Sequence, residues 1–328
     1  MKTIFAEMVA KKIYIRKTVN DDYVMQKKLY VDGVQTYSAG NNVTYYVDTN
    51  TVYTEEVEFD KSCLNPTSFT PSKSGYTFVG WREDTTANGN VLTDKVMGDN
   101  EVTLYAVFQK TITLTTRISG ASSTHTGYQY YNNGNIVNPT FTVANPTKSG
   151  ASFLGWSTAS TSTTVSYSTI SNRTFTANTT VYAVFKYADA TVSPTTVNPW
   201  EEVFFSGTQN RATIYSSVDT SKYYAATLTL AYASSRTDYT EARTDVYVSD
   251  GTNNALVVNS YVVSGGTKYE SQNTNLKPTL TFSTSSGTKP IYLRTKVTNY
   301  YTGASADTRG YYNVYVSSIK LLGRTVVG

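Results

Sequence analysis

Apolar and polar residues alternate in short runs along most of the chain. NVTYYVDT at 42–49 and YNVYVSSIKLL at 312–322 both alternate with a period of two. This alternation predicts strands with one buried face. Clusters of Gly, Asn, Asp and Ser lie between the runs, as in SDGTNN at 249–254, and these residues favour turns. The pattern therefore predicts a mainly all-β protein.

Residues 188–328 are expected to form a C-terminal antiparallel β-sandwich. The proline-bearing stretch TVSPTTVNPW leads into them. Strand candidates separated by short turns follow, as is typical of a sandwich. They are ATIYSSV, YYAATLTLAY, TDVYVSD, ALVVNSYVV, PTLTFST, PIYLRTKV and YYNVYVSSIKLL.

Residues 1–41 predict a separate N-terminal β segment. Strand candidates cover 13–19, 23–31 and 34–39, and Asp32-Gly33 between the last two is a strong hairpin signal. We interpret this segment as a docking module or a small β module.

The middle of the chain contains an internal repeat. KSGYTFVGW at 73–81 returns as KSGASFLGW at 148–156, 75 residues later. Two further pairs match, namely Asn-Pro-Thr at 65–67 and 138–140, and the closing strands LYAVF at 104–108 and VYAVF at 181–185. We therefore predict two tandem units, 42–110 and 111–187.

The shared residues predict one small aromatic core in each unit. A glycine precedes each Trp and allows another backbone segment to approach. The Phe three positions before the Trp would point to the opposite face of a regular strand, so a bulge is expected at that glycine. The predicted core residues are Gly75, Phe78, Gly80, Trp81, Tyr105 and Phe108, and their counterparts Gly150, Phe153, Gly155, Trp156, Tyr182 and Phe185.

These motifs resemble the Listeria–Bacteroides repeat, also called the internalin B-repeat. Its hallmark is P-x-(K/R)-x-G-Y-x-F-x-G-W followed by T-L-Y-A-x-W, and the chain has PSKSGYTFVGW with TLYAVF and PTKSGASFLGW with TVYAVF. Three features depart from the family: the closing aromatic is Phe, Ala151 replaces the usual Tyr, and the Gly-Gly turn after the first strand is missing. The resemblance implies β-grasp-like modules that serve as stalks, spacers or adhesive units without chemistry of their own.

Composition and charge narrow the classes of function. Charged residues are only 16 % of the chain, while Tyr occurs 29 times. The net charge is +4, and the one basic group, at 11–17, lies on a predicted strand that would divide it between two faces. Nucleic-acid binding is therefore not expected, because it needs a dense basic surface. Cys63 is the single cysteine, so we expect no intrachain disulfide and a small buried side chain there.

The N-terminal sequence MKTIFAEMVAKK predicts no secretory signal, because Glu7 interrupts a short apolar run and two lysines follow. No apolar run approaches the ~20 residues of a membrane span. The C-terminal sequence KLLGRTVVG contains no wall-sorting motif or anchor. We expect a chain that is made in the cytoplasm and is not exported by the usual route.

No catalytic constellation is evident, so we expect no enzyme, no cofactor and no metal. His125 is the single histidine, in the loop-like stretch SSTHTG. Glu55, Glu56 and Glu58 share one predicted strand, and an acid pair there could flank a glycosidic bond, although a solvated strand face is the favoured interpretation.

Two further polar groups have a plain and a functional interpretation. Glu201 and Glu202 follow Trp200 and could form a sugar subsite, but entry into the first sandwich strand explains them more simply. The stretch from Asp250 to Asn254 suggests a calcium loop, but calcium needs six or more oxygen ligands and a tight turn explains the same residues.

Tyrosine pairs recur along the chain, among them those at 130–131, 223–224, 300–301 and 311–312. Adjacent strand residues point to opposite faces, so one Tyr of each pair can face solvent and offer rigid contact area. Ordinary cross-strand packing is the competing interpretation. The residues predicted as a contact surface are Tyr130, Tyr131, Trp200, Tyr300 and Tyr301.

These features favour a virion structural protein of a tailed bacteriophage: a capsid decoration, a head fibre or a tail appendage. On this hypothesis the chain assembles in the host cytoplasm, leaves by lysis, docks on the particle and projects its β modules. Its expected partners are other virion proteins, further copies of itself and a host-surface glycan or protein, with no membrane insertion. A bacterial cell-surface adhesin, or a fragment of one, is the alternative that the repeat family favours. A carbohydrate-active enzyme would require an acid pair in a groove.

Overall fold

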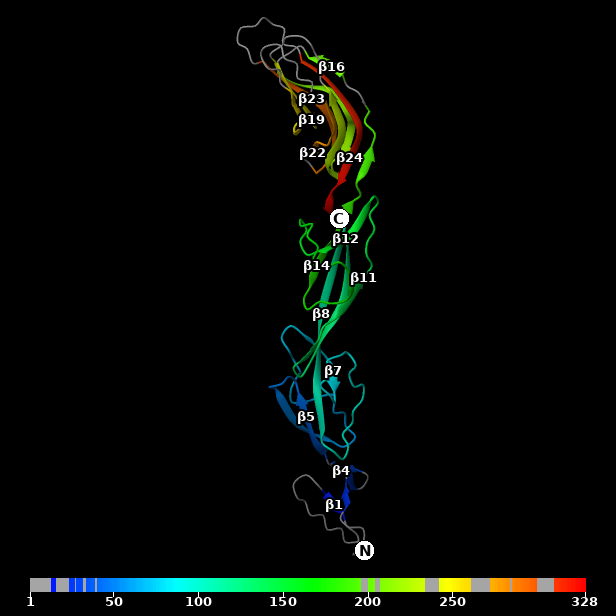
Figure 1. The fold of residues 1–328 in the computed structure, drawn as a ribbon. Helices are drawn as coiled ribbons and strands as arrows, with labels where there is room; N and C mark the ends of the chain where they lie inside the picture. The colour runs from blue at the N-terminus through cyan, green and yellow to red at the C-terminus, as the bar shows by residue number, and fades with distance from the viewer. Residues whose placement is uncertain are drawn as a thin grey trace, which may run out of the picture. The chain divides into compact units, whose positions relative to one another are not determined.

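The computed structural model describes residues 13–15, 24–26, 28–31, 34–38, 40–195, 200–203, 207–233, 242–260, 272–283, 285–299 and 310–328. Strands form all the regular structure in this part of the chain, so the all-β prediction is confirmed (Figure 1). Within the same residues there is no helix with the length and apolar character needed to cross a membrane.

The N-terminal segment contains two short antiparallel pairs. Strand β1 (Ile13–Ile15) pairs with β2 (Val24–Gln26), and β3 (Lys28–Val31) pairs with β4 (Val34–Ser38). Val31 lies opposite Val34, so two residues separate the paired positions, as the Asp-Gly signal at 32–33 predicts.

The chain folds into two compact units, each with its own contacts. The first comprises residues 1–117, 121–144 and 170–181, and the second comprises 118–120, 145–169 and 182–328. The first unit thus holds the first repeat and part of the second. The second unit holds the rest of the second repeat and the C-terminal region.

In the first unit, β8 (Val102–Ile118) is the central strand of the first repeat. Strand β5 (Gly40–Tyr46) runs parallel to it on one side, and β7 (Thr77–Arg82) pairs antiparallel with it. Strand β6 (Val52–Glu58) pairs with β5. The buried cluster of this repeat is Val43, Tyr45, Val47, Cys63, Trp81, Met97, Val102, Leu104, Ala106, Phe108 and Tyr131.

Strand β8 is 17 residues long because it closes the first repeat and continues without a turn as the opening strand of the second (Figure 1). Strand β9 lies beside it, and Asn133-Gly134, both with positive φ, make the tight turn from β9 to β10. The remaining strands of this part are β9 (Ala121–Asn132), β10 (Asn135–Val137), β11 (Thr140–Val143), β13 (Ile170–Thr174) and the first residues of β14 (Thr179–Tyr187).

In the second unit, β12 (Ala151–Ser157) pairs antiparallel with β14, and β25 (Thr325–Val327) pairs with β14 as well. The C-terminal region has two sheets that share one buried cluster, as the sandwich prediction requires. The six-stranded sheet contains β15 (Ala190–Val192), β16 (Trp200–Val203), β18 (Tyr223–Ala233), β21 (Gln272–Leu276), β22 (Thr279–Thr281) and β24 (Gly310–Gly323). The four-stranded sheet contains β17 (Gly207–Asp219), β19 (Ala242–Ser249), β20 (Asn254–Ser260) and β23 (Thr288–Asn299).

Candidate functional site: the junctions between modules

The repeated motif forms the same bulged strand in both repeats. The pairing of β7 with β8 shifts between Phe78 and Gly80, and the pairing of β12 with β14 shifts between Phe153 and Gly155. The shift brings each Phe to the side of its Trp, with ring centroids 5.2 Å apart in the first repeat and 5.5 Å in the second. The predicted bulge is therefore present at both positions.

The position before each Trp requires glycine, because the backbone has a positive φ there and a Cβ would have no room. Gly80 and Gly155 have φ values of +156° and +148°, which L residues rarely adopt. A Cβ on Gly80 would lie 2.8 Å from Val91, and one on Gly155 would lie 2.5 Å from Val165 and 2.6 Å from the carbonyl oxygen of Tyr167. The motif thus lets a loop pass directly over the strand.

The predicted core residues are buried to different degrees: Phe78 and Phe153 are half-buried, and the turn glycines Gly75 and Gly150 are exposed, which corrects their assignment to the core. The two Trp side chains, Phe108 and Phe185 are essentially inaccessible to solvent. Tyr105 and Tyr182 correct the prediction: both are only half-buried, because their neighbours in the closing strands face the core. Tyr105 instead stacks on Tyr46, with ring centroids 5.0 Å apart.

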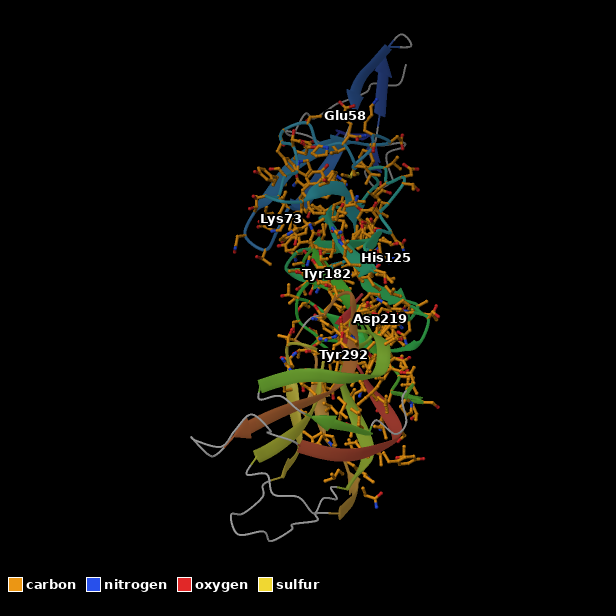
Figure 2. All side chains as sticks on the ribbon, turned by 90° about the horizontal axis from the view of Figure 1, so that it is seen from above. Glu58, Lys73, His125, Tyr182, Asp219 and Tyr292 are labelled. Atoms are coloured by element: carbon orange, nitrogen blue, oxygen red, sulfur yellow. The ribbon has the colours of Figure 1, made fainter. Side chains whose placement is uncertain are left out.

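The junction between the repeats is built around Tyr131, which is only 7 % exposed. This residue comes from β9 of the second repeat but belongs to the buried cluster of the first. Its ring lies 6.1 Å from that of Tyr76 and 6.4 Å from that of Phe108, and the Lys73 ammonium lies 3.7 Å from its centroid. Lys73 is labelled in Figure 2. The core of the first repeat is therefore completed by the second.

Polar contacts fix the same junction. The hydroxyl of Tyr76 donates to Gln129 Oε1 at 2.6 Å. The fully buried Asn132 donates from Nδ2 to the carbonyl oxygens of Asp84 and Thr86, at 2.9 and 3.1 Å. Side-chain hydrogen bonds from Arg82, together with a backbone N–H, hold the pKa of Asp84 well below its usual range. Side chains of one repeat thus satisfy the backbone of the other.

The predicted contact residues lie in different places. Tyr131 is buried in the junction, which corrects its assignment to an exposed surface. Tyr130 is half-buried, and its hydroxyl lies so close to Gly89 that a Cβ there would be 2.6 Å away. Trp200 begins β16 and pairs with Asn313 in the backbone register. Tyr300 and Tyr301 lie outside the described residues.

Glu55 accepts several hydrogen bonds that could not be predicted from the sequence. Its carboxylate accepts hydrogen bonds from the backbone N–H groups of Thr67 and Ser68, and from the hydroxyl of the buried Tyr45. Partial burial opposes ionisation, but hydrogen bonds from Ser68 and Thr67 outweigh it and lower the pKa of Glu55. Burial, reinforced by the charge of Glu55, raises the pKa of Tyr45 well above its ordinary value. This carboxylate therefore anchors a loop.

The structure also places the other residues that the sequence analysis considered for chemistry. Cys63 is fully buried in the first core, as predicted. Asp250 is 3 % exposed, and its Oδ1 accepts from the N–H groups of Thr252 and Asn253, at 2.8 and 2.6 Å, which closes a tight turn. His125 lies on β9 and is labelled in Figure 2. In the part of the chain that the structure describes, no three His, Cys, Asp or Glu side chains gather as metal ligands would.

A second junction joins the second repeat to the sandwich. Asp189 accepts a hydrogen bond from the N–H of Gly323 at 2.9 Å and forms an ion pair with Lys320 at 3.1 Å. The hydrogen bond from Gly323, followed by that from Lys320, lowers the pKa of Asp189. Arg324 donates from Nε to the carbonyl oxygen of Thr220 at 3.0 Å. The chain therefore crosses this junction twice, near residue 188 and near residue 324.

Comparison with known proteins identifies the repeats. Residues 42–107 and 111–184 match the family model of the Listeria-Bacteroides repeat domain. The chain therefore contains two tandem copies of this repeat, as the sequence predicted. Among solved structures, a chain of "Structure of infectious bursal disease virus Gx strain" is similar over 97 % of this chain and 63 % of its own length, with a TM-score of 0.25 and 12 % identity. At this TM-score the likeness does not establish a shared fold.

Proposed function

We propose that this chain is a non-enzymatic structural protein that separates a docking segment from a contact surface by means of closely joined β modules. The observation that carries the proposal is the junction between the repeats, where β8 runs from one into the other without a turn and Tyr131 fills the neighbouring core. A spacer needs such junctions, because a flexible linker would let its modules swivel.

We propose further that the spacer belongs to the virion of a tailed bacteriophage, as a capsid decoration, a head fibre or a tail appendage. The low charge content and the abundance of Tyr support a protein that works through many neutral contacts. On this proposal residues 1–41 dock on the particle, other virion proteins and further copies of this chain are neighbours, and the sandwich contacts a host-surface glycan or protein.

A bacterial cell-surface adhesin is the second candidate, and the presence of two Listeria-Bacteroides repeats favours it. Both candidate functions would use the junctions in the same way. They differ in the structure to which the chain is attached, which is a virus particle in one case and a cell surface in the other. Localisation in the source organism therefore separates them.

The test is a fractionation of a lysed culture of the source on a density gradient, followed by immunoblotting for this chain. Co-sedimentation with DNA-containing particles is the expected result. Recovery with the cell envelope would replace the virion proposal by the adhesin. Recovery only with soluble proteins would contradict both, and glycan hydrolysis assays would then test for an enzyme.

A further inference from the structure

Strand β25 extends from the sandwich onto the second repeat. It pairs antiparallel with the closing strand β14, and Val326 lies directly opposite Phe185. The N–H of Gly328 donates to the carbonyl oxygen of Ala183 at 2.7 Å, which prolongs the pairing. Figure 1 shows the marked C-terminus beside β12 and β14.

The segment of residues 323–328 packs closely against the second repeat at both of its ends. A Cβ on Gly323 would lie 1.8 Å from the carbonyl oxygen of Tyr187, and a Cβ on Gly328 would lie 2.6 Å from the ring of Phe185. The backbone of Arg324 is held between two elements, because its carbonyl accepts from Tyr187 and its N–H donates to Lys222, at 3.0 and 2.7 Å. At Gly323, where two backbone segments cross, only glycine fits.

The first repeat has the same arrangement with a different strand. Phe108 is the counterpart of Phe185, 77 residues earlier, and both are fully buried. Strand β9 lies beside the closing strand β8, and its Tyr131 packs on Phe108. A lysine at the same motif position accompanies each pair, with Lys73 over the ring of Tyr131 and Lys148 at 5.5 Å from the ring of Phe185.

We propose that the closing strand of this repeat carries a strand-acceptor edge, an interaction surface whose partner is an extended strand that runs antiparallel to it. Strand β9 fills this edge in the first repeat, and β25 fills it in the second. The sandwich is thus attached to the repeat by the same type of contact that attaches one repeat to the next. Backbone pairing supplies the affinity and the residue opposite the closing Phe supplies the specificity. The inference is independent of whether a virion or a cell surface carries the chain.

Two substitutions of Val326 test this inference. For each variant, hydrogen exchange of the full chain is measured by mass spectrometry over residues 183–187. Val326→Asp places a carboxylate opposite the buried Phe185, so β25 should detach and exchange should accelerate by at least about tenfold. Val326→Tyr copies the Tyr131–Phe108 pair, so the protection should be kept. Leu256→Ser on β20, where the side chain is 46 % exposed, is the control and should leave residues 183–187 unchanged.

A chain that lacks residues 325–328 gives a second reading. It should lose the same protection, and a synthetic peptide of residues 323–328 at millimolar concentration should restore it. Unchanged exchange over residues 183–187 in Val326→Asp would overturn the inference, whether or not the shortened chain folds. Loss of protection in Val326→Tyr equal to that in Val326→Asp would overturn the equivalence with the first repeat.

Discussion

The two repeats share one motif, but the residues of that motif contact different neighbours in each repeat. The indole Nε1 of Trp81 donates to the carbonyl oxygen of Leu64 at 3.0 Å. For Trp156, by contrast, no acceptor is found among the residues that the structure describes. Tyr76 binds Gln129 of the next repeat, whereas Ala151 stands at its position in the second repeat. The motif therefore fixes the bulge and the buried ring, and the flanking residues adapt to the module that follows.

The largest expected effect concerns the residue that completes the first core. Tyr131→Ala should destabilise the chain by about 3 kcal/mol, because it removes a buried ring from three neighbours. Denaturant unfolding, with hydrogen exchange over residues 76–82, measures the loss. Tyr128→Ala, on the same strand at 45 % exposure, is the matched control and should cost under about 1 kcal/mol. Equal costs for the two substitutions would mean that the junction does not depend on Tyr131.

The next effect compares the two bulge glycines. Gly155→Ala should cost more than Gly80→Ala, by roughly 1–2 kcal/mol, because its Cβ meets a backbone carbonyl as well as a side chain. Thermal unfolding of both variants measures the difference. Gly98→Ala is the control, since no heavy atom lies within 4 Å of its Cβ position. A larger cost at Gly80 would contradict this account of the bulge.

A smaller effect isolates the indole hydrogen bond. Trp81→Phe should cost about 1 kcal/mol more than Trp156→Phe, because it leaves the carbonyl of Leu64 without its donor. Trp156→Phe removes a buried N–H that has no acceptor among the described residues, so only ring volume is lost. Chemical denaturation of the two variants under one buffer condition gives the comparison. Equal destabilisation would show that the two Trp environments are alike.

The smallest effect depends on pH. The folded-state pKa of Glu55 lies below its ordinary value of 4.5, so its contribution is complete above that pH and is lost as the pH falls through the lowered pKa. Glu55→Gln should therefore lower stability by about 1 kcal/mol at pH 7, and the difference from the parent chain should shrink as the pH falls below 4.5. Melting temperatures across this range test the trend. Glu58→Gln, at an exposed position of the same strand, is the matched control and should change stability at pH 7 by under about 0.5 kcal/mol.

The sequence predicted the features that depend on local patterns. Period-two alternation gave the strands, and the Gly-Trp spacing gave the bulge, because sterics near one residue decide both. It did not predict the junction, because the burial of Tyr131 depends on a core that lies many residues away in the chain. Asn133-Gly134 was an available signal, since this pair favours the hairpin that presents Tyr131. Glu55 was ambiguous for the same reason, as its partners at 67 and 68 belong to a loop.

The most direct test of the central claim measures how tightly the repeats are joined. Spin labels at Glu58→Cys on β6 and Ser122→Cys on β9, both exposed positions, report the distance across the first unit by double electron–electron resonance. Cys63→Ala removes the one native thiol. The account predicts a single narrow distance distribution that Tyr131→Ala broadens. A broad distribution in the parent chain would show that the repeats swivel, and would contradict a spacer built on a shared strand.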